Sequence, residues 1–199
     1  MPKIDAATVA EHRAQRERQV ADAALDLLTG EGPSAVTPAA VAERAGLART
    51  SVYQYAGSGA ELVALAVEAL FVQAEASLAG AVAAAGGDPE DRIEAIVRAV
   101  LIAAADGHSP HHAVEVERLP AAQRARLVDL HRRLMAPLED AITDAGVADA
   151  ATVAALAWGA INGVVPMLEH GAPVGVLVPL AVGFVRAGVR GSAAGGSVR

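Results

Sequence analysis

The spacing of apolar residues is the feature that most constrains this chain. Apolar residues recur every three to four positions along nearly all of its 199 residues, which is the period of an amphipathic α-helix. No stretch shows the strict alternation of apolar and polar residues that a half-buried strand has. We therefore expect an all-α protein.

Glycine and proline positions divide this pattern into successive helices. Gly46 separates two short ones, and Pro137 is expected to bend a long helix rather than end it. The expected helices are 6–29, 38–45, 49–55, 61–85, 89–105, 111–118, 120–145, 149–170 and 173–190. This organisation predicts a three-helix head over residues 1–57, a body of roughly six helices over residues 58–190, and a flexible tail over residues 191–199.

Composition excludes several classes of function. The chain has no cysteine, so disulfides, thiol catalysis and cysteine-ligated metal centres are ruled out. Its formal net charge of −7 argues against a protein that coats nucleic acid without specificity, although a sequence-specific reader can segregate its charges. No basic segment precedes an apolar run at the start of the chain, so we expect a cytoplasmic protein.

Residues 36–56, VTPAAVAERAGLARTSVYQYA, have the pattern of a helix-turn-helix. A threonine N-cap and a proline open the first helix, and a glycine supplies the turn. The second helix presents arginine, glutamine and hydroxyl side chains, which suit guanine, adenine and phosphate groups. A helical hairpin inside an ordinary bundle is the alternative interpretation. The expected DNA contacts are Thr37, Pro38, Arg49, Thr50, Ser51, Tyr53, Gln54 and Tyr55.

This region closely resembles the DNA-binding domain of TetR-family regulators. The resemblance rests on Arg18, the run 23–28, Gly32, Thr37, the run 41–47, Val52, Tyr53, Tyr55, Glu61 and Leu62. It implies three helices for operator DNA and about six more for dimerisation and a small-molecule ligand. It also implies a two-fold dimer held by the last two helices, which reads a pseudo-palindromic double-stranded operator. Separately, no set of residues in the chain suggests catalysis, so no enzyme is expected.

The chain departs from the family pattern after the second short helix. The family commonly places a lysine there against a DNA phosphate, whereas residues 56–59 read Ala-Gly-Ser-Gly. Arg13, Arg16 and Arg18 either compensate for this contact or simply form a solvated helix face.

The body is expected to hold an elongated, mainly apolar pocket for an uncharged or weakly polar effector. Its helices are rich in alanine and poor in aromatic residues, which leaves room for a cavity, although close packing without a cavity is the alternative. Residues 158–163, WGAING, resemble a tryptophan-histidine-glycine signature of one branch of the family, with Asn162 in the histidine position. The expected lining residues are Val97, Leu101, His112, Leu127, Leu134, Trp158 and Asn162.

The last two helices are expected to form a homodimer rather than a membrane hairpin. The apolar run of the final helix is short for the roughly 20 residues that a membrane span needs, and Asn162 and Pro166 suit a buried soluble helix. The expected interface residues are Leu156, Ile161, Val165, Leu177, Leu180 and Phe184.

Other chemistry finds little support in the sequence. His108, His111 and His112 lie near Asp106, Glu115 and Glu117, but only His111 and Glu115 have metal-ligand spacing, so no metal is expected. No phosphate-binding loop, cofactor motif or catalytic group is present. The favoured function is a ligand-responsive repressor. The alternative is a helical small-molecule-binding protein that does not regulate through DNA.

Overall fold

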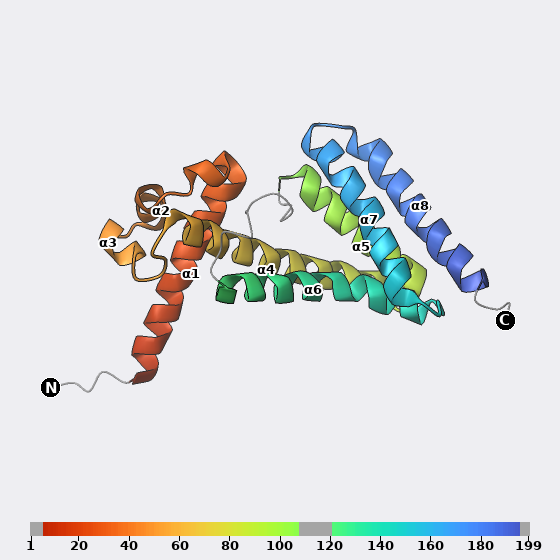
Figure 1. The fold of residues 1–199 in the computed structure, drawn as a ribbon, viewed down its shortest axis with the longest axis horizontal. Coiled ribbons are helices and arrows are strands. Elements are labelled where there is room, and N and C mark those ends of the chain that lie inside the picture. Colours follow the sequence, from red (N-terminus) through yellow and green to blue (C-terminus); the bar gives the residue numbers. More distant parts are fainter. Residues whose placement is uncertain (1–5, 108–120, 196–199) are drawn as a thin grey trace. The chain divides into compact units, whose positions relative to one another are not determined.

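The computed structural model describes residues 6–107 and 121–195, and every regular element in these ranges is a helix (Figure 1). The expected all-α fold is thereby confirmed. The expected helix at 111–118, the pocket candidate His112 and the remaining residues of the histidine cluster from His108 to Glu117 lie outside the described ranges. The elements are α1 (Ala6–Glu31), the 3₁₀-helix η1 (Pro33–Ala35), α2 (Pro38–Ala45), α3 (Arg49–Val52), α4 (Gly59–Ala85), α5 (Pro89–Ala105), α6 (Ala121–Asp144), α7 (Ala150–Glu169) and α8 (Val174–Gly195).

Local capping explains where α5 and α7 begin. The Asp88 carboxylate accepts a hydrogen bond from the Glu90 backbone N–H at 2.8 Å, and Pro89 is the first helical residue. Asp149 caps α7 in the same way, accepting from the Thr152 N–H at 3.3 Å. Each carboxylate satisfies a backbone donor that the first helical turn leaves unpaired.

The helix α8 is longer than expected. It continues through Gly191 to Gly195, so the first part of the expected flexible tail is helical. Two alanines in this segment have high helix propensity, and the Ser192 hydroxyl donates back to the Gly188 carbonyl at 2.9 Å. Prolines also fail to end helices here: Pro137 lies inside α6, as expected, and Pro179 lies inside α8.

The chain packs into two compact units. The first contains α1, η1, α2 and α3, with α4 as far as Leu70 and α6 as far as Leu127. The second contains the rest of α4 and α6 together with α5, α7 and α8. The sequence pattern placed a boundary at residue 57, whereas packing places it inside α4.

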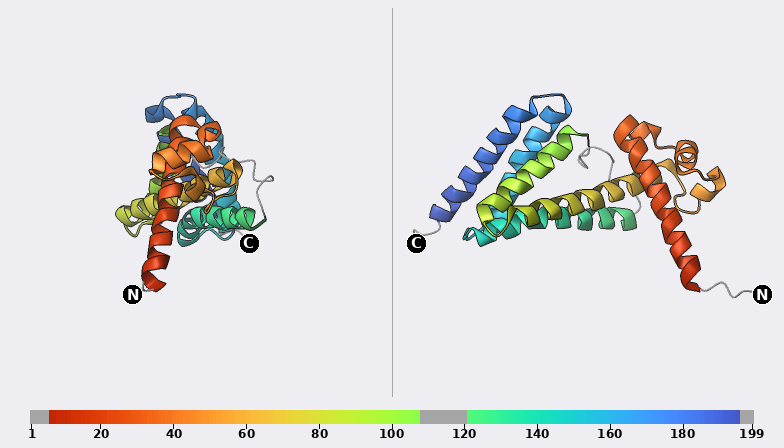
Figure 2. Two further views of the ribbon diagram at one scale, coloured as in Figure 1. Left: turned by 90° about the vertical axis from the view of Figure 1, so that its left-hand side faces the viewer. Right: turned by 180° about the vertical axis from the view of Figure 1, so that it is seen from behind.

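The core of the first unit forms between the second half of α1, the short helices and the start of α4. Val20, Leu27, Val41, Val52 and Leu62 are all buried there. In contrast, every residue from 10 to 19 of α1 is exposed. Figure 2 shows the same arrangement, with α2 and α3 beside the later part of α1 and its earlier part extending beyond them. Arg13, Arg16 and Arg18 therefore lie on a helix segment that no described residue covers.

The second unit is built around α5, α7 and α8, which pack on one another. Ile93, Val97 and Leu101 of α5 and Ile161 and Val165 of α7 are fully buried or nearly so. Because Ile161 and Val165 are covered within the unit itself, the expectation that they form the dimer interface is wrong.

An ion-pair network joins α5 to α8 in the second unit. The Arg186 guanidinium pairs with Glu90 at 2.7 Å and also with Glu94. Arg190 reaches Glu90 at 3.0 Å, and Arg98 reaches Glu94 at 2.7 Å. Arg186, Glu90 and Glu94 are each half-buried, so their attraction is less screened than that of a fully exposed pair. Hydrogen bonds from arginine hold the pKa of Glu94 below its ordinary value.

Three helices, α4, α7 and α8, are long and apolar enough in composition to cross a membrane. Less than half of each apolar stretch is buried within the structure. Length and composition do not by themselves indicate a membrane location, because apolar helix faces also serve protein–protein contacts. The exposed apolar parts of α7 and α8 are therefore candidate surfaces for contact with another protein chain.

Candidate DNA interface and effector site

The helix α2 begins and ends as the sequence predicts. Thr37 has extended backbone angles, and its hydroxyl oxygen accepts a hydrogen bond from the Ala40 N–H at 3.2 Å. Gly46 adopts a left-handed conformation with φ of 65°, which favours glycine. The Leu47 N–H then donates to the Ala42 carbonyl at 2.9 Å. This turn reverses the chain between α2 and α3 within a few residues, as a helix-turn-helix requires.

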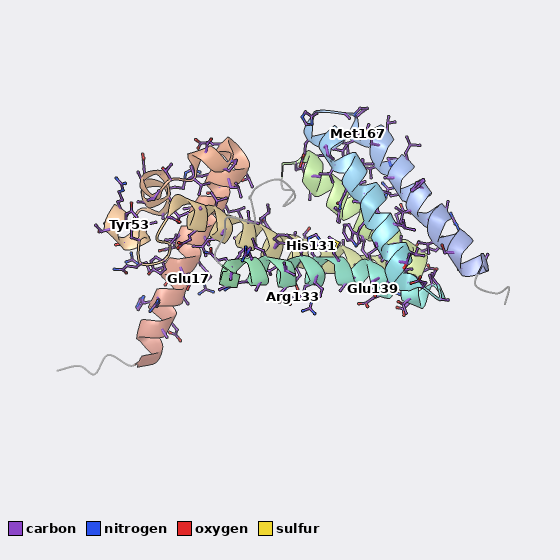
Figure 3. All side chains as sticks on the ribbon, viewed as in Figure 1. Glu17, Tyr53, His131, Arg133, Glu139 and Met167 are labelled. Carbon is purple, nitrogen blue, oxygen red and sulfur yellow. The ribbon has the colours of Figure 1, made fainter. Side chains whose placement is uncertain are left out.

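The helix α3 is shorter than expected and ends at Val52, with a hydrogen-bonded turn over residues 53–55. Val52 is fully buried and anchors the segment. The Arg49 guanidinium donates to the Tyr53 hydroxyl at 3.4 Å, and Figure 3 shows Tyr53 on the outer side of this unit. Of the expected DNA contacts, Pro38, Ser51 and Tyr55 are half-buried, whereas the remaining five are exposed: Thr37, Arg49, Thr50, Tyr53 and Gln54.

Ser58 and Glu61 cap the start of α4, which the sequence analysis did not predict. The Ser58 hydroxyl accepts from the Glu61 N–H at 3.2 Å, and a Glu61 carboxylate oxygen accepts from the Gly57 N–H at 2.8 Å. The serine and the glutamate stand three residues apart, the spacing of a capping box, which was the available signal. Residues 56–59, which lack the family's lysine, therefore use their polar groups to start α4.

The two arginines of residues 32–58 have different surroundings. Arg44 contacts two carboxylates of α1, Glu31 at 3.2 Å and Asp26 at 3.8 Å, and so links α2 to α1. Arg49 lies on α3 and donates a hydrogen bond to the Tyr53 hydroxyl rather than pairing with a carboxylate among the described residues. Arg49 is consequently the cation of this motif that is available to a nucleic acid.

Residues 20–66 match the family described as bacterial regulatory proteins, tetR family. The chain carries the DNA-binding domain of the tetR family. This match covers α2, α3 and the beginning of α4, together with the buried part of α1. The match assigns residues 20–66 to a family of bacterial regulatory proteins. No curated protein matches the chain significantly.

Solved structures share the fold over most of the chain. A putative transcriptional regulator from Pseudomonas aeruginosa has a TM-score of 0.70 and 21% identity, with 92% of each chain covered. A TetR-like regulator from Rhodococcus has a TM-score of 0.65 and 21% identity, covering 92% of this chain and 98% of the other. The regulator FadR from Bacillus subtilis, solved in complex with stearoyl-CoA, has a TM-score of 0.67 and 14% identity, covering 86% and 98%. The TM-scores show that the chain shares its fold with these regulators.

The described effector candidates come from α5, α6 and α7. Five are buried: Val97 and Leu101 on α5, Leu127 and Leu134 on α6, and Trp158 on α7. Leu127 belongs to the first unit and the other four to the second. Asn162 is half-buried one turn after Trp158.

A second set of apolar side chains on α7 and α8 is exposed. Leu180 and Phe184 are 65% and 69% exposed and lie one turn apart on α8, with Val176 one turn earlier. On α7, Leu156 is 69% exposed and Met167 is also exposed. We call these five residues the α7–α8 apolar face. Of the expected interface, Leu156, Leu180 and Phe184 belong to it.

Glu68 on α4 is a buried carboxylate that sequence reasoning missed. Its carboxylate pairs with the Arg126 guanidinium of α6 at 2.7 Å. Burial raises the pKa of Glu68, the positive charge of Arg126 lowers it, and the negative charge of Glu17 on α1 raises it further. Glu17 and the helices involved are visible in Figure 3. A lone acid in the apolar run LVALAVEALFV was the available signal.

Removing Arg126 is expected to destabilise the protein at neutral pH. The pKa of Glu68 is raised in the folded state, so the buried charge opposes folding at pH 7, and this cost falls as pH drops through the folded pKa. Arg126→Ala removes the attraction that limits the cost and should lower the free energy of unfolding by about 1–2 kcal/mol at pH 7. The loss should shrink on acidification. Urea denaturation at several pH values measures both effects.

Glu68→Gln is the matched comparison, because it removes the buried charge and leaves Arg126 exposed to solvent. It should leave stability at pH 7 unchanged or raise it. Arg133→Ala, an exposed arginine on the same helix, serves as the control. A Glu68→Gln protein that is much less stable than the original would show that the ionised pair stabilises the fold.

Proposed function

We propose that this protein is a cytoplasmic, homodimeric repressor that leaves a pseudo-palindromic operator when a small, mainly apolar effector binds. The observation that carries the proposal is the tetR-family DNA-binding domain joined to a separately packed helical unit. A sequence-specific head and a second unit with its own core are the two parts that a one-component regulator needs. The fold shared with solved transcriptional regulators supports this assignment.

In this proposal the exposed residues of the helix-turn-helix contact DNA. The Arg49 guanidinium is suited to guanine and the Gln54 amide to adenine, because both make two hydrogen bonds to a base edge. Hydroxyls at Thr37, Thr50 and Tyr53 are suited to phosphates. The half-buried residues Pro38, Ser51 and Tyr55 then serve mainly by packing and by backbone or partial side-chain contact.

We further propose that the α7–α8 apolar face is covered by a second copy of the chain. Exposed patches of large apolar side chains on soluble proteins mark interaction surfaces. A two-fold pairing of this face would bury Leu180 and Phe184 of both copies and would bring two DNA-binding heads to one operator.

The effector is proposed to bind within the second unit, among the buried residues of α5, α6 and α7, with Val97, Leu101, Leu134, Trp158 and Asn162 as candidate lining residues. Their apolar character favours a mainly apolar molecule, since a buried charge would need a paired charge. A neighbour of the same fold was solved with stearoyl-CoA, a molecule with a long apolar chain. This supports an apolar body for the effector.

Arg49→Ala and Gln54→Ala are each expected to weaken operator binding about tenfold, because each removes a base contact while leaving the fold intact. Tyr55→Ala should also weaken it, through lost packing behind α3. The DNA would be a duplex selected from a random pool by the purified chain, with binding followed by fluorescence anisotropy. Arg133→Ala and Gln73→Ala make the same chemical changes at exposed positions outside the motif and should leave affinity unchanged.

The same assay distinguishes the alternative function, a helical small-molecule-binding protein that does not regulate through DNA. The missing lysine and the few cations of the motif favour that alternative. A true operator reader loses affinity steeply as salt rises, because each phosphate contact releases counterions. A chain that selects no duplex, or whose affinity is insensitive to Arg49→Ala and Gln54→Ala, would refute the proposed reading of DNA by α3.

A further inference from the structure

Two polar atoms on α7 are buried without a hydrogen-bond partner among the residues that the structure describes. They are the indole Nε1 of Trp158 and the amide Oδ1 of Asn162. Trp158 is only 6% exposed, so water has little access to its N–H. Burying an unpaired donor or acceptor opposes folding, and buried polar groups are nearly always satisfied in native proteins. Two such atoms one turn apart therefore call for an explanation.

Their positions suit a single small group of a ligand. Residues four apart lie on one side of a helix, with Cβ atoms about 5–6 Å from each other. The neighbouring buried residues of α7 are apolar, including Ala157, Ile161 and Val165. A ligand with an apolar body and one polar group can therefore place that group between the two side chains.

The chemistry of the two atoms restricts that polar group. An indole N–H can only donate a hydrogen bond, and an amide oxygen can only accept one. The group must therefore accept one hydrogen bond and donate another. An ionised carboxylate, an ether or a ketone only accepts, and the carboxylate would also bring an unpaired charge into an apolar region.

We propose that the effector carries an uncharged hydroxyl on an apolar body. Trp158 Nε1 donates to the hydroxyl oxygen, and Asn162 Oδ1 accepts the hydroxyl hydrogen. The inference rests on the proposed function, since it names the chemical class of the effector bound by the same unit. It also explains why an otherwise apolar helix keeps an asparagine with a buried oxygen.

Matched alcohols and ethers test the proposal on the full-length chain. The probes are primary alcohols of increasing length and their isomeric methyl ethers, for example 1-octanol against 1-methoxyheptane, with octanoate and octane as further arms. Trp158 is the single tryptophan, so its emission reports binding directly. The alcohols should shift the emission and release selected duplex at concentrations roughly three- to tenfold lower than the ethers, which lack the donated hydrogen bond. Equal responses to alcohol and ether, or no response to any alcohol, would overturn the proposal.

Two variants test the named atoms. Asn162→Leu should abolish the preference for alcohols and raise the melting temperature of the ligand-free protein by about 2–4 °C, because it removes an unpaired buried oxygen. Trp158→Phe should abolish the same preference, read by DNA release. Gln123→Met is the matched control: Gln123 also has a buried, unpaired amide oxygen, but on α6 in the first unit. It should leave the alcohol preference intact. A lower melting temperature for Asn162→Leu would show that the amide already has a partner, and would overturn the proposal.

Failure of the proposed function gives a different result from failure of this inference. A chain that binds alcohols at Trp158 but selects no duplex contradicts the repressor and supports the hydroxyl site. A chain whose DNA is released equally by alcohols and ethers supports the repressor and overturns the hydroxyl site.

Discussion

Leu180→Arg is expected to convert the protein from a dimer into monomers that bind operator DNA poorly. Leu180 lies at the centre of the α8 stripe between Val176 and Phe184, and 65% of it is exposed. The substitution therefore leaves the core of the second unit untouched, but it places two guanidinium groups in a proposed apolar interface. Burying unpaired charges there costs far more than the lost apolar contact. Losing the second DNA-binding head should reduce operator affinity about 10²–10⁴-fold.

Light scattering at micromolar concentration measures this directly, because one chain has a mass of 20.0 kDa. Val128→Arg is the matched control: Val128 is also 65% exposed, but it lies on α6 outside the α7–α8 apolar face. That variant should remain dimeric and bind DNA normally. A monodisperse monomer for the unmodified chain would refute the interface, and association of the chain with lipid vesicles would assign the apolar face to a membrane instead.

Arg186→Glu is expected to be the most destabilising change to the charged groups of the second unit. It replaces the shared partner of Glu90 and Glu94 with a third carboxylate, on side chains that are all half-buried. We expect the free energy of unfolding to fall by about 2–3 kcal/mol at pH 7, less than for a fully buried pair because solvent still screens the charges. Arg190→Glu makes the same change one turn later at a more exposed side chain, and should cost clearly less.

The pH dependence of the two proteins should have opposite signs. In the unmodified chain the pKa of Glu94 is lowered by its arginine partners. Its contribution to stability is therefore present above the ordinary glutamate pKa and is lost as pH falls below it. In Arg186→Glu the clustered carboxylates repel one another, so acidification should restore stability. Thermal unfolding from pH 7 to about pH 3 measures both trends, since the loss in the unmodified chain falls below the ordinary glutamate pKa. A parallel loss of stability in the two proteins would show that the network contributes little.

Sequence reasoning was most successful where the signal is local. The bounds of α2 and α5 were predicted correctly, because Thr37, Pro38 and Pro89 define where each helix begins and Gly46 and Asp106 follow where each ends. The all-helical fold and the helix-turn-helix followed from periodicity and a few turn residues. The cap at Ser58 was equally local and was missed because two glycines flank it.

Features that depend on distant residues could not be predicted in this way. Glu90 and Arg186 are 96 residues apart, and nothing local shows that they meet. The same limit applies to α7. This helix carries apolar residues around much of its circumference, so the sequence does not show which side faces the core. Periodicity alone did not separate Ile161, which faces the unit's own core, from Leu156, which is exposed. Predicting which residues line a pocket and which contact a partner requires that distinction.

The brevity of α3 has a consequence for how its amides exchange with solvent. A four-residue helix is too short to supply its own N–H groups with the usual partners four residues back. The N–H groups of Ser51, Gln54 and Tyr55 instead donate to carbonyls three residues back, a tighter and poorer geometry. These amides should therefore exchange deuterium through local opening, far faster than those of α5, and DNA should slow them. Ordering this segment on DNA costs conformational entropy, which opposes binding. The operator contacts must therefore be strong enough to outweigh this cost.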